Sequence, residues 1–393
     1  MKKLRIKNFG PIKEGFTDSE DGFFDISKLT LLVGDQGTGK STIAKIISLF
    51  SWLEKQNQGQ SNKVTVISSN DLCEKYLKFH RIDSFLQKDT EIIYTTDNSS
   101  LYYADGELHI QNVNEDYVRP KVLYIPAERS FCSAITNPNK ISGMPSNVMD
   151  FLSDYYDSVK AQQGKKILLP LNGYEFRFSE NENSAYISDN SAGYEIKIEN
   201  ASSGLQSVAP MYITINHYLD QLLLPVEKRG NELNIFQIAK LKLLANNNTH
   251  SLNELIQEQK KIINSRLVCI IEEPEQSLFP TSQYELIMNL LMGFSNKTDN
   301  SLVITTHSPY ILETINNIIY ADSITSNGKS IEHLIPSDCH ISFDNVSAYQ
   351  IENGKIHSIM DNEIKQIDSG AIDRCSKTIN EVYSKLTDID FGE

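Results

Sequence analysis

The chain has 393 residues, of which 40% are hydrophobic and 22% are charged, an ordinary composition for a globular protein of two domains or one large elaborated domain. Its formal net charge is −14, from 37 basic and 51 acidic residues, which argues against nucleic-acid binding through a general positive field. No apolar run approaches the length of a membrane span, so we expect no membrane segment.

The first third of the chain predicts strands around one long helix. Residues 1–33 read as strands, with 26–33 entering a glycine-rich loop, and the apolar positions after that loop recur at helical spacing. Residues 70–86 are expected to be helical. A meander is predicted next, with Asp105-Gly106 as its last tight turn, over residues 91–96, 101–104 and 107–110.

The rest of the chain alternates strands and helices. After a short strand at 121–125, the composition predicts a loop at 133–147, a helix at 148–162, three strands at 174–178, 185–188 and 194–198, and mainly helix over 205–265. The continuous apolar runs at 267–271 and 302–306 are typical of parallel strands buried on both faces. A hairpin around Asn353-Gly354 and a helix over 371–386 are expected to end the chain.

The glycine-rich loop has the pattern G-x-x-x-x-G-K-[ST], which is typical of the phosphate-binding P-loop. In that loop backbone N–H groups point at the phosphates of a nucleoside triphosphate, and a helix N-terminus adds positive potential. Lys40 is expected to add a positive charge and Ser41 a hydroxyl ligand for Mg²⁺. The nucleotide-binding residues predicted in this segment are Gly34, Asp35, Gln36, Gly37, Thr38, Gly39, Lys40, Ser41 and Thr42.

A second motif is the acidic end of the strand at 267–271. In P-loop enzymes such a strand delivers a carboxylate to the metal, which makes Glu272 the predicted Mg²⁺ ligand. Glu273 is the candidate that orients or deprotonates the attacking water. By itself, the pattern is more typical of a strand with a polar end at the protein surface.

Two weaker signals accompany these motifs. His307 directly follows the strand at 302–306, where a γ-phosphate sensor would lie, although a lone histidine there is usually a loop residue. The run Ser202-Ser203-Gly204-Leu205-Gln206 precedes a helix and, by itself, is no more specific than a helix N-cap.

Together, the four segments resemble the ABC-class ATPases, in particular the branch that contains SMC-type repair ATPases and OLD-family proteins. Residues 203–206 look like the Ser-Gly-x-Gln core of the ABC signature, 272–275 look like the Walker B acid pair before a D-loop at 276–280, and His307 matches the switch histidine. The order of the motifs is also that of the family, and residues 4–12 resemble its opening strand.

The resemblance implies an α/β fold, a P-loop NTPase of ABC/SMC type with a core parallel sheet, a flanking antiparallel β-subdomain and an inserted helical subdomain. It implies an ATPase with ATP and Mg²⁺ as cofactors, with Glu273 and His307 as catalytic residues and with Ser41 and Glu272 holding the metal. It also implies a homodimer or higher homo-oligomer formed through ATP, in which Ser203, Gly204 and Gln206 of one copy close on the nucleotide of another.

The sequence departs from the family pattern in three places. Glu272 stands where Walker B usually has aspartate, and Leu205 replaces the second glycine of the signature. No Q-loop glutamine is obvious, and residues 125–129 are a candidate for the related position, with no role assigned to them. Within that segment, we expect Glu128 and Arg129 to form a structural ion pair.

The resemblance also narrows the biological role. No convincing Asp-x-Asp cluster follows Pro309, so we expect no TOPRIM nuclease domain in this chain. Stand-alone ATPases of this kind occur in bacterial antiphage systems of the Septu, retron-associated and PARIS types, where they control a separately encoded nuclease or toxin. The alternatives are a DNA-repair ATPase of the RecF/SMC type that binds DNA directly and, less favoured, an ABC transporter ATPase subunit.

We expect one ATPase domain over residues 1–393, with a P-loop lobe at 1–130, an inserted segment at 131–265 and a Walker B lobe at 266–393. The five scattered cysteines form no C-x-x-C pair, which is typical of reduced thiols, and the N-terminus lacks the apolar core of a signal peptide. The expected location is therefore the cytoplasm. Small basic clusters such as Lys165-Lys166 and Lys260-Lys261 are more typical of a solvated face than of a DNA groove.

Overall fold

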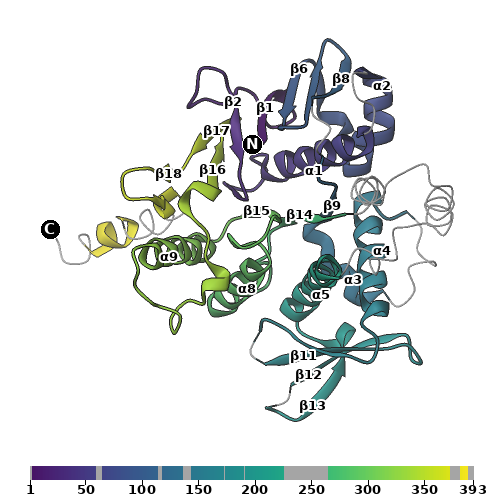
Figure 1. The fold of residues 1–393 in the computed structure, drawn as a ribbon, viewed down its shortest axis with the longest axis vertical. Helices are drawn as coiled ribbons and strands as arrows, with labels where there is room; N and C mark the ends of the chain where they lie inside the picture. Colours follow the sequence, from purple (N-terminus) through teal and green to yellow (C-terminus); the bar gives the residue numbers. More distant parts are fainter. Residues whose placement is uncertain are drawn as a thin grey trace, which may run out of the picture.

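The fold is built on a central seven-stranded sheet (Figure 1). The computed structural model describes residues 2–58, 64–113, 117–135, 143–171, 173–189, 191–224, 264–371 and 381–387. The strand order is β2-β17-β16-β4-β15-β14-β9. The bounds are β2 Gly15–Phe16, β17 Lys355–Ser358, β16 Val346–Glu352, β4 Leu29–Val33, β15 Ser301–Thr306, β14 Arg266–Glu272 and β9 Pro120–Ile125.

Five neighbouring strands of this sheet, from β16 to β9, run parallel, and β17 is antiparallel to β16. The parallel strands read as continuous apolar runs because both of their faces are covered. Within β4, for example, Leu31 faces one hydrophobic core and Leu32 faces the other, since successive side chains of a strand point to opposite faces.

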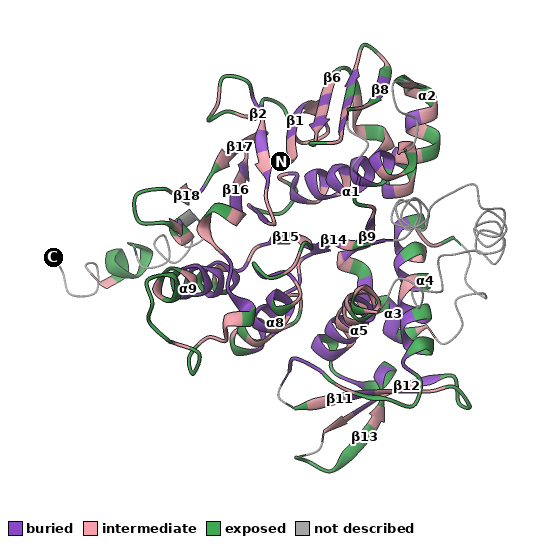
Figure 2. Ribbon diagram, viewed as in Figure 1, coloured by how far each residue is buried: buried purple, intermediate pink, exposed green. Residues whose placement is uncertain are grey.

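One face of the sheet is covered by α1 (Lys40–Asn57) and, beyond it, by a six-stranded antiparallel sheet. That second sheet has the order β3-β1-β6-β7-β8-β5. Its strands are β3 Phe24–Ile26, β1 Lys2–Phe9, β6 Leu86–Thr95, β7 Ser99–Ala104, β8 Glu107–Asn112 and β5 Val64–Ser68. Figure 2 shows that α1 is largely buried between the two sheets.

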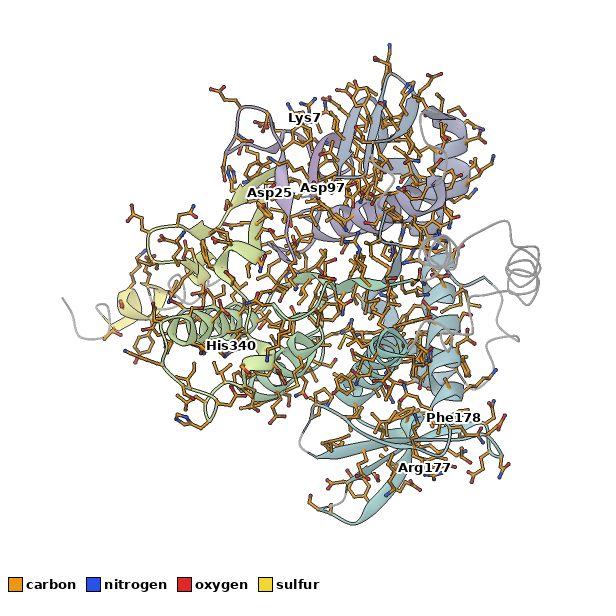
Figure 3. The ribbon with its side chains drawn as sticks, viewed as in Figure 1. Lys7, Asp25, Asp97, Arg177, Phe178 and His340 are labelled. Carbon is orange, nitrogen blue, oxygen red and sulfur yellow. The ribbon has the colours of Figure 1, made fainter. Side chains whose placement is uncertain are left out.

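The other face is covered by helices: α3 Phe131–Ala134, α4 Ser146–Ala161, α5 Ser203–Leu223, α8 Pro280–Met292 and α9 Pro309–Ser326. A four-stranded antiparallel sheet lies beyond α4 and α5, with β10 Lys166–Leu168, β11 Tyr174–Ser179, β12 Ser184–Asp189 and β13 Tyr194–Lys197. Figure 3 places Lys7 of β1 and Arg177 of β11 at opposite ends of the molecule, with the central sheet between them.

The predicted fold class is confirmed: the chain is an α/β protein with a largely parallel core sheet, a flanking antiparallel sheet and an inserted segment that contains helices. The predicted meander corresponds to β6, β7 and β8, and the hairpin around Asn353-Gly354 joins β16 to β17. Both residues of that turn have positive φ, 53° and 79°, as a type I′ hairpin turn requires.

Other expectations need correction. Residues 26–33 do not form one strand, because Ser27 and Lys28 separate β3 from β4 and the Ser27 N–H bonds the Ser347 hydroxyl at 3.4 Å. Residues 70–86 are helical only in short pieces, among them the π-helix Leu72–Leu77 and the 3₁₀ turn Lys78–His80. Strand β10 and helices α8 and α9 were not predicted.

Several predictions fall outside the described residues: the helical region from 225 to 263 with Lys260-Lys261, part of the 133–147 loop, and residues 372–380 of the C-terminal helix. Within the described ranges, none of the helices has the length and apolar character needed to cross a membrane. The described cysteines, Cys73, Cys132, Cys269 and Cys339, are free thiols.

Candidate ATP site at the edge of the parallel sheet

The glycine-rich loop joins the buried strand β4 to α1, and two of its glycines are required by close contacts. Gly34 has a φ of 150°, and a Cβ there would lie 2.4 Å from the carbonyl oxygen of Ile351. Gly39, the N-cap of α1, has a φ of 116°, and a Cβ would lie 2.6 Å from Cδ1 of Ile12. A side chain at either position would force the loop away from the neighbouring strand and from the N-terminal segment.

The Lys40 side chain folds back over this loop. Its ammonium donates hydrogen bonds to the carbonyl oxygens of Gly34 at 2.8 Å and Asp35 at 2.7 Å. Burial lowers the pKa of Lys40, although the negative charge of Glu273 acts in the opposite direction. The charge is thus already placed at the loop, whose tip, residues 35–37, is exposed.

The remaining residues of the predicted loop lie at its base. Thr38 closes the turn, since its hydroxyl donates to the Asp35 carbonyl at 2.9 Å. Ser41 is partly exposed on the first turn of α1, and Thr42 is buried behind it. The exposed loop tip, Lys40 and the Ser41 hydroxyl therefore belong to one local structure, as the P-loop hypothesis requires.

Glu272 ends β14 as a buried carboxylate, with 4% of the residue exposed. Its Oε1 accepts a hydrogen bond from the Tyr124 hydroxyl at 2.5 Å, and its Oε2 accepts one from the N–H of Ala127 at 3.4 Å. Both partners come from β9 and the segment after it, so the neighbouring strand orients this carboxylate. Sequence reasoning missed Tyr124; the only available signal is its position in the strand that precedes residues 125–129.

Glu273 adopts the left-handed region, with a φ of 44°, which turns the chain sharply out of β14. Its N–H bonds the Thr305 carbonyl at 3.0 Å, and its Oε1 lies 3.3 Å from Nε2 of His307. The hydrogen bond from His307 is the main reason that the pKa of Glu273 is lowered. The structure therefore brings together two residues, Glu273 and His307, that the sequence linked only through motif order.

Glu275 was not predicted as a site residue, yet it fixes the loop that carries His307. Its Oε1 accepts hydrogen bonds from the Thr306 hydroxyl and from the His307 N–H, both at 2.7 Å. Its Oε2 is buried and has no hydrogen-bond partner among the described residues. The Glu-Glu-Pro-Glu sequence could have drawn attention to it, because all three acids leave the same buried strand.

The expected ion pair between Glu128 and Arg129 is wrong. Glu128 pairs with Arg81 at 2.6 Å on the surface, whereas Arg129 is completely buried. The Arg129 guanidinium donates to the carbonyl oxygens of Glu272 and Glu273, each at 2.6 Å, and its Nε donates to that of Ser207 at 3.3 Å.

Burial lowers the pKa of Arg129 to about 10, which still leaves the side chain charged at neutral pH. Its fork of fixed donors therefore ties the acid pair to α5.

The predicted signature residues lie at the N-terminus of α5. Ser202 caps the helix by accepting a hydrogen bond from the Leu205 N–H at 3.4 Å, and Ser203 is exposed. Gly204 lies against the D-loop segment, where a Cβ would be 2.9 Å from the Ser277 carbonyl oxygen. Among the described residues, no hydrogen bond or ion pair links Ser203 or Gly204 to residues 34–42.

Gln206 has a local structural task. Its side-chain amide donates to the carbonyl oxygens of Glu199 at 2.9 Å and Ala201 at 3.0 Å, which fixes the turn before α5. In this arrangement the Gln206 amide is directed at its own chain. The predicted contact between Gln206 and a nucleotide therefore requires its side chain to rearrange, whereas the contacts predicted for Ser203 and Gly204 require no such change.

The comparison with protein families agrees with an ATPase. The family described as "AAA ATPase domain" matches residues 1–171 and 134–312. Among curated proteins, no sequence matches the chain.

Three similar solved structures are an SMC head bound to the C-winged helix domain of ScpA, the SMC head domain from Thermotoga maritima, and a dimeric ATP-binding cassette in a post-hydrolysis state bound to ADP and Pi. The identities are 10%, 11% and 9%, and the TM-scores are 0.37, 0.34 and 0.34. Each covers 91% of this chain, and the chain covers 96%, 97% and 96% of them. Since the two matched ranges together span residues 1–312, more than half of the 393 residues, this chain belongs to the AAA ATPase domain family.

Proposed function

We propose that the chain is a Mg²⁺-dependent ATPase of the ABC/SMC type. The observation that carries the proposal is the register of the central sheet, in which Glu272 pairs with Thr305 and Thr306 pairs with Val33. The acid pair, His307 and the P-loop therefore leave neighbouring parallel strands at one edge. Ligands of open α/β sheets bind outside the carboxyl ends of such strands.

The P-loop residues bind the triphosphate in this proposal. The N–H groups of residues 37–41 and the Lys40 ammonium hold the β- and γ-phosphates, and the N-terminus of α1 favours their negative charge. The exposed loop tip leaves this surface accessible to a nucleotide.

The residues present suit a magnesium ion, because Mg²⁺ prefers oxygen ligands. Ser41 offers a hydroxyl and Glu272 a carboxylate, which Tyr124 already orients from behind. When bound, the ion would neutralise the negative charge that develops on the phosphates.

Glu273 and His307 act on the attacking water. The lowered pKa of Glu273 keeps its carboxylate ionised at neutral pH, ready to accept a hydrogen bond or a proton. His307 holds that carboxylate from one side, at 3.3 Å, and its loop is anchored through Glu275. Displacement of His307 would therefore shift the Glu273 carboxylate and so change the position of the attacking water.

The proposed switch is ATP-dependent association of two or more copies. Ser203 and Gly204 begin a 21-residue helix whose N-terminus favours negative charge, and the Ser203 side chain is exposed. In the head-to-tail arrangement of the ABC class, this helix end closes on the γ-phosphate held by another copy. Hydrolysis then removes the group that both copies contact.

The proposed role of this switch is control of a separately encoded nuclease or toxin in antiphage defence. It follows the motif resemblance, and the net charge of −14 favours it over direct, general DNA binding. Co-purification of the chain with the product of a neighbouring gene would support this role. DNA-stimulated hydrolysis with a steep salt dependence would instead support a DNA-repair ATPase.

The first experiment is ATP hydrolysis by the full chain with Mg²⁺, with excess chelator, and in the Lys40→Ala variant. We expect hydrolysis only with Mg²⁺, and a decrease of about 100-fold or more in Lys40→Ala because a charge aimed at the transferred phosphate is lost. Lys88→Ala, an exposed lysine on β6, is the matched control and should retain the wild-type rate. Equal rates in Lys40→Ala and wild type would refute the P-loop assignment.

A further inference from the structure

A cavity of about 310 Å³ lies between α1, the helical turns at 72–80 and β9, and none of its lining residues belongs to the P-loop. The volume is at the lower end of the range for small-molecule sites. One wall includes the π-helix Leu72–Leu77, a rare conformation that is frequent at functional sites.

The walls of this cavity are rich in aromatic rings. Trp52 of α1 is 41% exposed, and its ring lies 6.1 Å from that of Tyr76. The rings of Phe79 and Tyr124 each pack edge-on against the ring of His80, with 4.9 Å between ring centroids. Such a group of rings favours a planar ligand, since stacking and edge contacts both stabilise it.

The polar groups at the cavity are few and varied. His80 is 2% exposed, and its buried Nδ1 has no hydrogen-bond partner among the described residues. Burial lowers the pKa of His80 to about 3, so the ring is neutral and offers one donor and one acceptor. Lys75, paired with Asp71 at 2.7 Å, and Asp150 of α4 add opposite charges at the exposed rim.

We propose that this cavity binds a free purine mononucleotide, with the base among Trp52, Tyr76 and Phe79 and the phosphate toward Lys75. The base can exchange hydrogen bonds with His80 and with the Asp150 carboxylate. A purine mononucleotide suits this combination because its base is a flat ring with several donors and acceptors and its phosphate is an anionic group at one end.

The cavity is linked to the candidate ATP site through Tyr124. This residue lines the cavity, and its hydroxyl donates to Glu272 at 2.5 Å. A ligand that shifts the Tyr124 ring therefore changes the position of the carboxylate at the end of β14. This regulatory consequence rests on the proposed ATPase function, whereas binding of the nucleotide does not.

The test uses Trp52, which is the single tryptophan of the chain, so its fluorescence reports directly on the cavity. The full chain is titrated with adenosine monophosphate and, separately, with guanosine monophosphate. We expect a saturable change with at least one of them, and the same change in Lys40→Ala. Lys75→Ala should weaken binding about three- to fivefold, as the loss of an exposed charge contact does.

Lys78→Ala is the matched control, because Lys78 is also an exposed lysine in an i,i+4 pair, at 3.0 Å from Glu74, but does not line the cavity. The affinity of the Lys78→Ala variant for the mononucleotide should equal that of the wild type. The proposal is overturned if neither mononucleotide produces a saturable change in Trp52 fluorescence. It is also overturned if the change is lost in Lys40→Ala but kept in Lys75→Ala, or if Lys75→Ala and Lys78→Ala weaken mononucleotide binding equally.

Two further measurements test whether the ligand is a free nucleotide and whether its binding changes ATP turnover. Tighter binding of a short single-stranded oligonucleotide than of the mononucleotide would refute a free nucleotide as the ligand. ATP turnover should change at saturating mononucleotide in the wild type, and less so in Lys75→Ala at the same concentration. Unchanged turnover despite saturable binding would refute the regulatory link alone, and absent turnover in every sample would refute the proposed function without affecting the binding result.

Discussion

The edge of the central sheet and the N-terminus of α5 both carry predicted nucleotide contacts, but they are built differently. At the sheet edge, Lys40, Glu272 and Glu273 are held by hydrogen bonds from several elements. At the helix end, Ser203 is exposed and Gly204 lies against Ser277 and Leu278 of the same chain. The side chains at the sheet edge are therefore held in place within one chain. The helix end is exposed, as a surface that contacts a second copy would be.

The difference shows how the account can be tested. A preorganised region should respond to substitution through chemistry and stability within one chain. An exposed helix end should respond through association between chains, because its nucleotide contact is proposed to form only with a second copy. Arg129 connects the two regions, since it bonds the backbone of both Glu272 and Ser207.

The largest effect is expected for Glu273→Gln, which removes the carboxylate proposed to activate the water. Hydrolysis should fall by about 100-fold or more. ATP binding should persist, because Lys40 and Ser41 are unchanged, and the variant should accumulate as an ATP-bound dimer. Turnover assays and light scattering with ATP measure the two properties.

Glu363→Gln, at an exposed position near the C-terminus, is the control for Glu273→Gln and should behave as the wild type. If Glu273→Gln hydrolyses ATP normally, Glu273 is not the catalytic carboxylate. If it loses hydrolysis but remains monomeric with ATP, the chemistry is supported and the switch is not.

A smaller effect, on stability, is expected for Arg129→Met. The change leaves the carbonyl oxygens of Glu272 and Glu273 without their buried donor, which should cost about 3 kcal/mol in the free energy of unfolding. Chemical denaturation measures it. Arg81→Met, which breaks the exposed pair with Glu128, should cost at most about 1 kcal/mol, and equal losses in the two variants would contradict the role given to Arg129.

The smallest effect is expected for Tyr124→Phe. Loss of the hydroxyl that bonds Glu272 should loosen this carboxylate and lower the apparent affinity for Mg²⁺ in the hydrolysis assay by about tenfold. The maximum rate at high Mg²⁺ should change less. Tyr102→Phe, on the exposed side of β7, should leave the Mg²⁺ dependence unchanged; an identical curve for Tyr124→Phe would show that Tyr124 does not position the metal ligand.

Sequence reasoning succeeded where the signal is local. The P-loop carries its own strand–loop–helix context, and the runs at 267–271 and 302–306 have the continuous apolar character of doubly covered strands. The motif order also predicted that Glu272, Glu273 and His307 would lie near the loop. Their arrangement at one sheet edge agrees with that prediction, and their roles stay predictions.

It failed where the partner of a residue is distant in sequence. Arg129 was assigned to its neighbour Glu128, although its acceptors are the carbonyls of residues 272, 273 and 207. Tyr124 and Glu272 are 148 residues apart, and only the pairing of β9 with β14 brings them together. Helices α8 and α9 were missed, although Pro280 and Pro309 stand at helix starts, where proline is favoured.

The most direct test of the composite site mixes two inactive variants, Lys40→Ala and Ser203→Arg. Each should hydrolyse ATP poorly alone, the first for lack of the phosphate-binding lysine and the second because arginine blocks the exposed helix end. In an equimolar mixture about half of the head-to-tail dimers contain one copy of each variant, and every such mixed dimer has one intact site out of two. The mixture should therefore recover about a quarter of the wild-type rate. A mixture that remains as inactive as its components would contradict a site shared between two copies.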